Sequence, residues 1–294
     1  MYADVRAQAP EDIPEEVVWQ RYVEGCQRLV IETEEAMGAS RGEVASVLAS
    51  EVIEAIFGED WVASNLAEAK AYATQSNDPE VKRAFLHEEM QLGRYLFDLQ
   101  PYDFFPDLIA GLRNRHNELR GAMFEAEVVW LLKYIPLQSA IRIPTGIKTN
   151  DYDIGVPFGD DEWPIEVKAK EDIAFTPKTL KQTLETARRQ LPPGGVGTIF
   201  VRIPRTWGDL AAYGDDAETV ISDALRSSSR VHAVVLISDA WTTELNQRFQ
   251  TPRLVARVFC STDCDPRVKK LLESYQVLWN ADPVMFHPVW SRVI

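Results

Sequence analysis

The chain has 294 residues, 46% hydrophobic and 26% charged, so it is long enough for one large domain or two ordinary ones and is too apolar to be disordered. No segment approaches the ~18 uninterrupted apolar residues of a membrane span, and the N-terminal "MYADVRAQAPEDIPEE" lacks the features of a signal peptide. The net charge of −14 lies entirely in residues 1–110, which hold 22 acidic and 8 basic residues. The remainder is neutral, so the global charge does not exclude nucleic acid as a partner.

The cysteine and histidine content argues against disulfide and zinc chemistry. Three cysteines provide no disulfide framework, so we expect a protein of the reducing cytoplasm with no membrane partner. Cys260 and Cys264 are spaced C-x3-C, but no second pair accompanies them. The four histidines show no ligand spacing either, so we expect no structural zinc site.

Residues 14–110 are predicted to form helices. The segment 14–38 begins at Pro14 and has Gly38 near its end, and the segment 40–58 has Ser40 as a candidate N-cap with Glu43 three residues later. A third helix begins at Asp78-Pro79 and runs to residue 99. Two Glu-x-Lys tripeptides, at 68–70 and 80–82, fall in or beside these helices and are interpreted as solvated surface charge.

Two prolines in "QPYDFFPDL" indicate a domain boundary near residues 105–112. We therefore divide the chain into an acidic helical region, 1–110, and an α/β domain, 111–294. The α/β domain is predicted to open with an amphipathic helix, "NELRGAMFEAEVVWLLKYI", which ends at Pro136. Three strands are expected to follow, in "SAIRIP", "DYDIGVP" and "WPIEVKA".

The rest of the α/β domain alternates between helix and strand. "TPKTLKQTLETARRQ" predicts a helix, "VGTIFVRIP" a strand, "DDAETVISDALRSS" a helix and "VHAVVLISD" a buried strand. "RLVARVFC" and "QVLWN" are expected to add further strands. This order predicts an α/β fold with a mixed central sheet.

The stretch "NDYDIGVPFGDDEWPIEVKAK" places charge on two segments that are otherwise suited to burial. In an extended strand Glu166, Lys168 and Lys170 project from one face, and a hairpin would bring Asp153 beside Glu166. Two neighbouring carboxylates suit a hard cation such as Mg²⁺, and a nearby lysine can position water or stabilise charge on phosphorus. The alternative interpretation is an edge hairpin whose charges simply face water.

Four neighbouring residues have alternative interpretations. Asp151 is interpreted as a turn residue or as a second acidic ligand, and Trp163 as a packing residue or as a base-stacking one. Arg142 and Lys148 are interpreted as solvated loop charges or as phosphate contacts.

The segments "RGAMFEAEVVWLL", "DYDIGV" and "PIEVKAK", in this order, resemble the PD-(D/E)XK nuclease superfamily. The resemblance covers roughly residues 118–203 and implies a restriction-endonuclease-like αβββαβ core. It implies Asp153, Glu166 and Glu125 as Mg²⁺ ligands, with Mn²⁺ as a substitute, and Lys168 as the catalytic lysine. Glu125 is preferred over Glu127 because Gly121 lies four residues before it, and Tyr152 stands where the family pattern often has proline.

The first functional hypothesis is a metal-dependent nuclease that acts on DNA rather than RNA. A helix that carries Lys178, Lys181 and Gln182 follows the Glu-x-Lys strand, so these residues and Lys170 are the candidates for nucleic-acid binding. The alternative is a catalytically inactive module on a nuclease fold that binds nucleic acid or protein. Further partner hypotheses are a protein that docks on the acidic helical region and a second copy of the chain in a homodimer.

Overall fold

The computed structural model describes residues 2–38, 41–66, 75, 79–115, 119–133, 141–144, 152–170, 175–203, 207, 214–242 and 251–280. Its contacts divide the chain into two compact units, residues 1–134 together with 287–294, and residues 135–286. The boundary expected near residues 105–112 is instead occupied by a helix, and the division lies more than twenty residues later. Each unit is described below by itself.

The first unit is entirely helical in its described residues. Its helices are α1 (Tyr2–Gln8), α2 (Glu15–Met37), α3 (Arg41–Phe57), α4 (Glu59–Asn65), α6 (Pro79–Leu99), α7 (Phe105–Arg115) and α8 (Leu119–Lys133). The predicted helices at 14–38, 40–58 and 78–99 are confirmed as α2, α3 and α6. Gly38 ends α2 in the left-handed conformation that glycine adopts most easily (φ 60°). The expected cap at Ser40 lies outside the described residues.

The interior of this unit is formed mainly by α3, α6 and α8. Helix α8 was expected to be amphipathic, but every residue from 122 to 132 is buried, so the expectation of an exposed polar face is wrong. Two buried hydrogen bonds join α8 to α6. Tyr95 on α6 donates a hydrogen bond to the Glu127 carboxylate (2.8 Å), and Trp130 Nε1 donates to Asp98 Oδ2 (2.8 Å).

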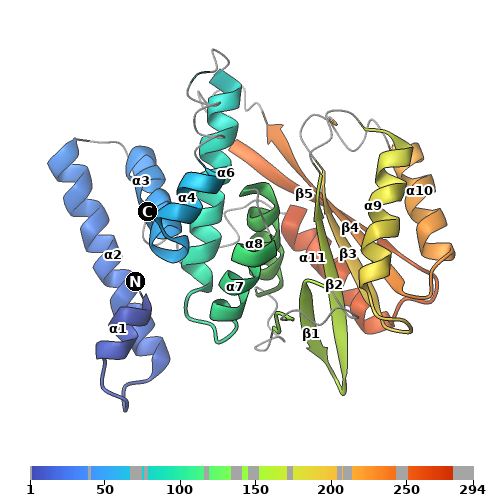
Figure 1. The fold of residues 1–294 in the computed structure, drawn as a ribbon, viewed down its shortest axis with the longest axis horizontal. Coiled ribbons are helices and arrows are strands. Elements are labelled where there is room, and N and C mark those ends of the chain that lie inside the picture. Colours follow the sequence, from blue (N-terminus) through green and yellow to red (C-terminus); the bar gives the residue numbers. More distant parts are fainter. Residues whose placement is uncertain are drawn as a thin grey trace. The chain divides into compact units, whose positions relative to one another are not determined.

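The second unit contains a mixed five-stranded sheet in the order β1-β2-β3-β4-β5 (Figure 1). Its strands are β1 (Ile154–Phe158), β2 (Asp161–Ala169), β3 (Gly197–Arg202), β4 (Val231–Thr242) and β5 (Thr251–Cys260). The pairs β1–β2 and β4–β5 are antiparallel, whereas β2–β3 and β3–β4 are parallel. The α/β fold with a mixed sheet is therefore confirmed.

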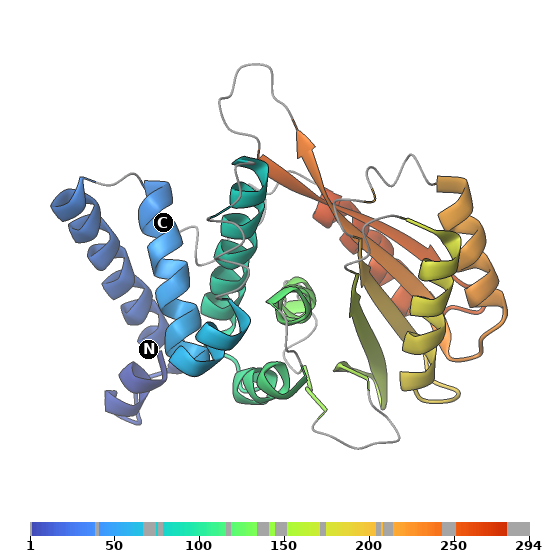
Figure 2. The same ribbon diagram turned by 45° about the horizontal axis from the view of Figure 1, so that its top comes forward.

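Helices cover both faces of this sheet. The parallel pairs are joined through α9 (Pro177–Gln190) and α10 (Gly214–Arg226), which lie on one face, while α11 (Pro266–Asn280) lies on the other (Figures 1 and 2). Residues from α9, α10, β3 and β4 form one apolar core cluster, which includes Leu184, Ile199, Ile221 and Val234. This cluster fixes α9 over β3 and β4, and β3 is the neighbour of the strand β2 that carries Glu166 and Lys168.

Two predicted strands differ from the structure. Within "SAIRIP", residues 141–144 make only an isolated bridge, in which Arg142 and Gly155 exchange backbone hydrogen bonds (2.7 and 2.8 Å). Pro144 has no N–H with which to continue this pairing. The segment "QVLWN" is the last part of α11 rather than a strand. Its helix buries Val268, Leu272 and Tyr275, and this helical spacing decides the conformation of the short apolar run.

Candidate functional site

Three of the four predicted catalytic residues lie close together: Asp153 directly precedes β1, and Glu166 and Lys168 are on β2. Ile154 pairs with Ile165, and extending this register by one residue places Asp153 opposite Glu166. Lys168 forms an ion pair with Glu166 Oε1. The expected hairpin is confirmed, and the alternation that placed Glu166 and Lys168 on one face of the strand is confirmed with it.

The register between the parallel strands β2 and β3 shows which face of the sheet carries Glu166 and Lys168. Glu166 is paired with Ile199 and Lys168 with Val201, and paired residues of parallel strands share a face. Ile199 and Val201 belong to the core cluster under α9 and α10. Glu166 and Lys168 therefore project from the face that α9 covers.

The carboxylate of Asp153 is held against the edge of β2. Its Oδ2 accepts a hydrogen bond from the backbone N–H of Val167 (2.8 Å), between Glu166 and Lys168 in the chain. Asp153 is 7% exposed and Glu166 is completely buried, whereas the Lys168 side chain retains 25% of its accessible surface. Burying a carboxylate is costly unless a hydrogen bond or a charge compensates it. Here the backbone N–H of Val167 compensates the burial of the Asp153 carboxylate, and the ammonium group of Lys168 compensates that of Glu166. The interpretation of these charges as simply facing water is wrong for the two acids.

The donor set fits a hard cation. Asp153 and Glu166 supply carboxylate oxygens from adjacent strands, and Mg²⁺ is held in many proteins by one or two carboxylates, with water and substrate oxygens as the other ligands. No group of three or more His, Cys, Asp or Glu side chains suited to holding an ion occurs among the described residues. Two carboxylates are therefore the largest protein ligand set that this part of the sheet offers.

Glu125, the fourth predicted catalytic residue, lies in α8 of the first unit, so the structure does not join it to the sheet residues. Its side chain is completely buried, and Glu127, two residues later, is almost as buried. Glu127 accepts the hydrogen bond from Tyr95 described above and therefore has a structural role within the helical unit.

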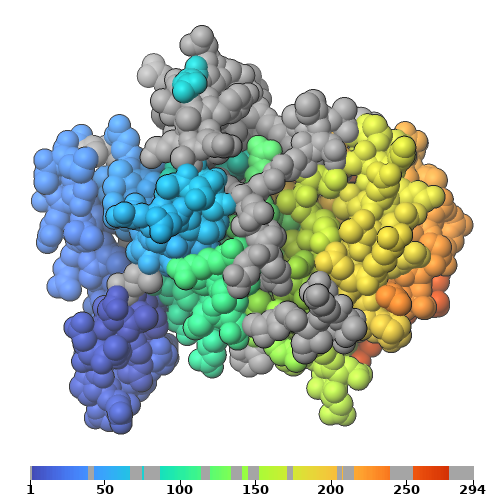
Figure 3. Space-filling model, in the orientation of Figure 1, coloured from blue at the N-terminus to red at the C-terminus, as the bar shows by residue number. Residues whose placement is uncertain are grey.

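The candidates for nucleic-acid binding lie at and after the end of β2. Lys170 follows the strand directly and is half-buried, while Lys178, Lys181 and Gln182 are exposed on α9. Helix α9 buries Leu180, Thr183, Leu184 and Ala187 against the sheet, so these three polar residues lie off its packed face. The outer surface of α9 is open in the space-filling view (Figure 3).

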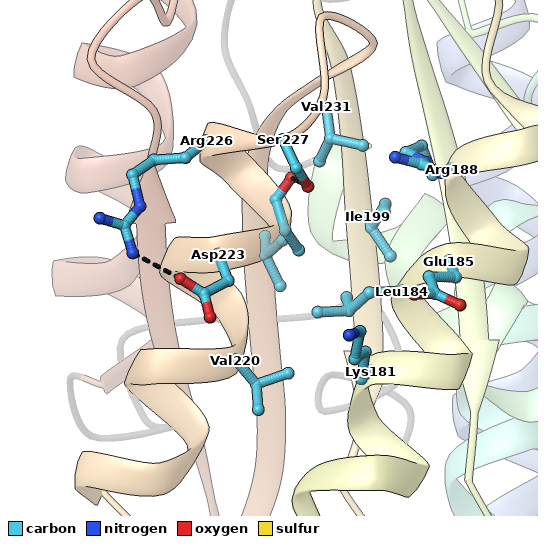
Figure 4. Close-up of a pocket in the computed structure, with 12 residues that line it drawn as sticks. Lys181, Leu184, Glu185, Arg188, Ile199, Val220, Asp223, Arg226, Ser227 and Val231 are labelled. Carbon is cyan, nitrogen blue, oxygen red and sulfur yellow. Dashed lines mark hydrogen bonds and ion pairs between the residues drawn. The ribbon is translucent and has the colours of Figure 1, made fainter.

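A groove between α9 and α10 adds a feature that no local sequence pattern indicated. It has a volume of about 460 Å³, and its floor is formed by apolar residues of α9, β3, α10 and β4, among them Leu184, Ile199 and Val220. Charged side chains surround this floor (Figure 4): Lys181, Glu185 and Arg188 on α9, and Asp223 with Arg226 on α10. Arg226 Nη2 contacts Asp223 Oδ1 at 2.5 Å.

The structure bears on the alternative interpretations of two residues near the site, Trp163 and Arg142. Trp163 is completely buried and donates a hydrogen bond to Thr198 Oγ1 (2.8 Å), which confirms packing. Arg142 keeps 64% of its side-chain surface exposed, as expected for a solvated charge, and it also pairs with Glu162 (2.6 Å) and donates to the Tyr152 hydroxyl (2.9 Å). Asp151 and Lys148 lie outside the described residues.

The cluster of Arg142, Tyr152 and Glu162 escaped the sequence analysis. Tyr152 donates to Glu162, and burial, reinforced by this carboxylate, raises the pKa of the Tyr152 hydroxyl so that it keeps its proton. Gly155 makes room for the arrangement, because a Cβ there would lie 2.4 Å from Glu162 Oε1. The alternation of side chains along β2 could have indicated this cluster, because it places Glu162 on the same face of the strand as Glu166.

Comparison of the chain with protein-family models, curated proteins and solved structures gives no match. Among the described residues, no helix is both long enough and apolar enough to cross a bilayer.

Proposed function

We propose that the second unit is a metal-dependent nuclease domain that hydrolyses phosphodiester bonds, with DNA as the preferred substrate. The observation that carries this proposal is the placement of two buried carboxylates, Asp153 and Glu166, on adjacent strands, with Lys168 paired to one of them. Buried acids that converge beside an amine are costly for folding and are typical of catalytic sites. The order of these residues along the chain agrees with the resemblance to PD-(D/E)XK nucleases.

In this proposal Asp153 and Glu166 hold Mg²⁺ or Mn²⁺, and Glu125 is the further acidic residue that the resemblance implies. The bound ion supplies Lewis-acid chemistry, which favours ionisation of water and neutralises phosphate charge. Lys168 orients the attacking water and stabilises the negative charge that develops on the phosphate. The backbone N–H of Val167 keeps the Asp153 carboxylate in one orientation. Lys178 and Lys181 contact the phosphates of the substrate strand.

The test compares Asp153→Asn with Asp161→Asn. The amide oxygen introduced by Asp153→Asn can still accept the hydrogen bond from Val167, so this substitution removes the charge and leaves the contact in place. Asp161 lies at the exposed start of β2 in the same hairpin and serves as the matched control. Cleavage of duplex, single-stranded and junction DNA and of RNA is measured with Mg²⁺, with Mn²⁺ and with a chelator. We expect ion-dependent cleavage by the parent and by Asp161→Asn, and a loss of about 100-fold or more in Asp153→Asn.

Equal cleavage by Asp153→Asn and the parent would exclude this site. If the parent cleaves none of these substrates with either ion, the second candidate function is preferred, namely a nuclease-fold module that binds nucleic acid or protein without cutting. The ion pair between Lys168 and Glu166 favours this alternative, because it already neutralises the buried glutamate without a metal ion.

A further inference from the structure

The groove between α9 and α10 has the size and the lining of a ligand pocket. Its volume of about 460 Å³ falls within the range of about 300–1,000 Å³ that is typical of small-molecule sites. Its apolar lining is aliphatic and consists of Leu184, Ile199, Val220, Ala224, Val231 and Val234. The floor residues Leu184 and Ile199 are almost completely buried, whereas Val220 and Ala224 on α10 remain partly exposed. A ligand in this groove therefore packs chiefly against the aliphatic wall that α10 provides.

The charged side chains around the groove leave one positive charge in excess. Asp223 forms an ion pair with Arg226, so these two charges cancel. Of the other three charged residues, Lys181 and Arg188 are positive and Glu185 is negative. None of these three forms an ion pair with another residue that the structure describes. The groove is therefore electrostatically complementary to a small monoanion.

Arg188 is the better placed of the two unpaired cations to hold an anionic head group. It is partly exposed, whereas Lys181, seven residues earlier and about 10 Å away along α9, is exposed. Figure 4 shows Arg188 at the end of the groove where Val231 lies. A partly buried cation has lost some of its hydration, so it gains more from an anion than a fully hydrated lysine does. Its guanidinium also offers two parallel N–H donors, which match a carboxylate.

We propose that the groove binds a free aliphatic carboxylate, whose head group pairs with Arg188 and whose alkyl chain packs against Val220 and Ala224. The lining residues that the structure describes include no aromatic ring, which favours an alkyl chain over a planar ligand that would stack. The excess positive charge favours a carboxylate over an ammonium head group. This site does not depend on the proposed nuclease function.

The first test measures the binding of straight-chain carboxylates to the full-length protein by isothermal titration calorimetry. The affinity should rise about twofold to fourfold for each added methylene from hexanoate through octanoate to decanoate, because each methylene removes apolar surface from water. Octanol and octylamine, which have the same chain without the negative charge, should bind at least fivefold more weakly than octanoate. Octylamine that binds as tightly as octanoate, or a series in which no carboxylate binds, would overturn the proposal.

Two adjacent arginines separate binding in the groove from general attraction to α9. Arg188→Gln should weaken octanoate binding about tenfold or more, because it removes the charged donor. Arg189 is exposed on the same helix and does not line the groove, so Arg189→Gln should bind octanoate as the parent does. Glu185→Gln should strengthen binding about twofold, since it removes a carboxylate that repels the ligand. Equal losses in Arg188→Gln and Arg189→Gln would contradict a site in the groove.

A substitution in the wall of the groove tests the place of the alkyl chain. Ala224→Leu narrows the groove from a partly exposed position on α10, and leucine is a good helix former, so we expect an unchanged midpoint of thermal unfolding. Octanoate binding should fall at least tenfold. Binding that survives Ala224→Leu would show that the ligand lies elsewhere. A second copy of the chain is the competing occupant: a dimer in sedimentation experiments that Ala224→Leu dissociates, together with no octanoate binding, would replace the proposal.

Discussion

The completely buried carboxylate of Glu166 has lost its hydration, and Lys168 compensates this loss from the next position on the same strand face. Asp153 is compensated differently, by a backbone N–H of the neighbouring strand. The two acids of the candidate site are therefore held by unlike partners, one a charge and the other a neutral donor. Losing each partner should have a different consequence for stability.

The Lys168–Glu166 pair provides a test of this difference. Lys168→Ala leaves the Glu166 carboxylate buried without its ammonium partner, so we expect the free energy of unfolding at neutral pH to fall by about 3 kcal/mol. Glu166→Gln in the same chain should restore most of this loss, because the double variant buries no uncompensated charge. Urea denaturation of the parent, both single variants and the double variant measures the coupling. Strictly additive effects would show that the two side chains do not interact.

At the scale of elements, α3 and α6 approach each other closely at Gly93. A Cβ at this position would lie 2.7 Å from the Cα and Cβ of Ala49 on α3, and Ala49 is itself completely buried. Glycine is therefore required in the middle of α6 by packing, although it is a weak helix former. Gly25 in α2 differs, because a Cβ there would meet nothing within 4 Å.

These two glycines form a matched pair for mutation. Gly93→Ala should destabilise the protein by about 1–3 kcal/mol, because α3 and α6 must move apart. Gly25→Ala should stabilise it by about 0.5–1 kcal/mol through helix propensity alone. Thermal and urea unfolding of the two variants measure both effects. A Gly93→Ala variant as stable as the parent would contradict the close approach of the helices.

The start of α11 depends on Asp265. Its Oδ1 accepts a hydrogen bond from the backbone N–H of Arg267 (2.8 Å), and its side chain pairs with the Arg267 guanidinium (2.8 Å). The hydrogen bond from the Arg267 side chain is the main cause that lowers the pKa of Asp265, to about 2. Backbone hydrogen bonds from Arg267 and Val268 add to this effect. The carboxylate is therefore the form that stabilises the beginning of the helix.

The pH dependence of this contribution follows from the lowered pKa. The ordinary aspartate value in the unfolded chain is about 4, so the contribution is complete above about pH 4 and is lost as the pH falls toward 2. Asp265→Ala should cost about 1 kcal/mol at pH 7, and the difference from the parent should shrink below about pH 4. Urea denaturation at a series of pH values measures it. A difference that stays constant from pH 7 to pH 2 would show that the carboxylate charge is unimportant.

At the scale of the whole molecule, the division after Tyr134 assigns α8 to the helical unit. Helix α8 is tied to α6 through the buried pairs Tyr95–Glu127 and Asp98–Trp130. The acidic excess of residues 1–110 therefore belongs to a unit whose interior α8 completes. An α/β fragment that begins at residue 111 would carry α8 without its partner helix.

Two truncated fragments distinguish a domain boundary before α8 from one after it. A fragment of residues 111–286 should expose the apolar surface of α8 and aggregate, whereas a fragment of residues 135–286 should be recovered in higher soluble yield. Size-exclusion chromatography and the cooperativity of thermal unfolding compare the two fragments. If the longer fragment is the more soluble and cooperative of the two, α8 belongs with the sheet.

The sequence predicted the elements whose signals are local. Pro14 and Gly38 mark the ends of α2, and strand alternation placed Glu166 and Lys168 on one face, because a strand's side-chain period does not depend on distant residues. The sequence also predicted the hairpin that carries Asp153, since a short glycine-containing turn joins its two strands.

Two features depended on contacts between distant parts of the chain. The burial of α8 follows from packing against remote parts of the chain such as α6, and not from its own pattern. The short run at residues 276–280 became helical because α11 packs its preceding turns against the sheet. Local spacing by itself determined which residues share a face. Only the tertiary structure decided which faces are buried and which side chains meet, because burial depends on neighbours that are remote in the sequence.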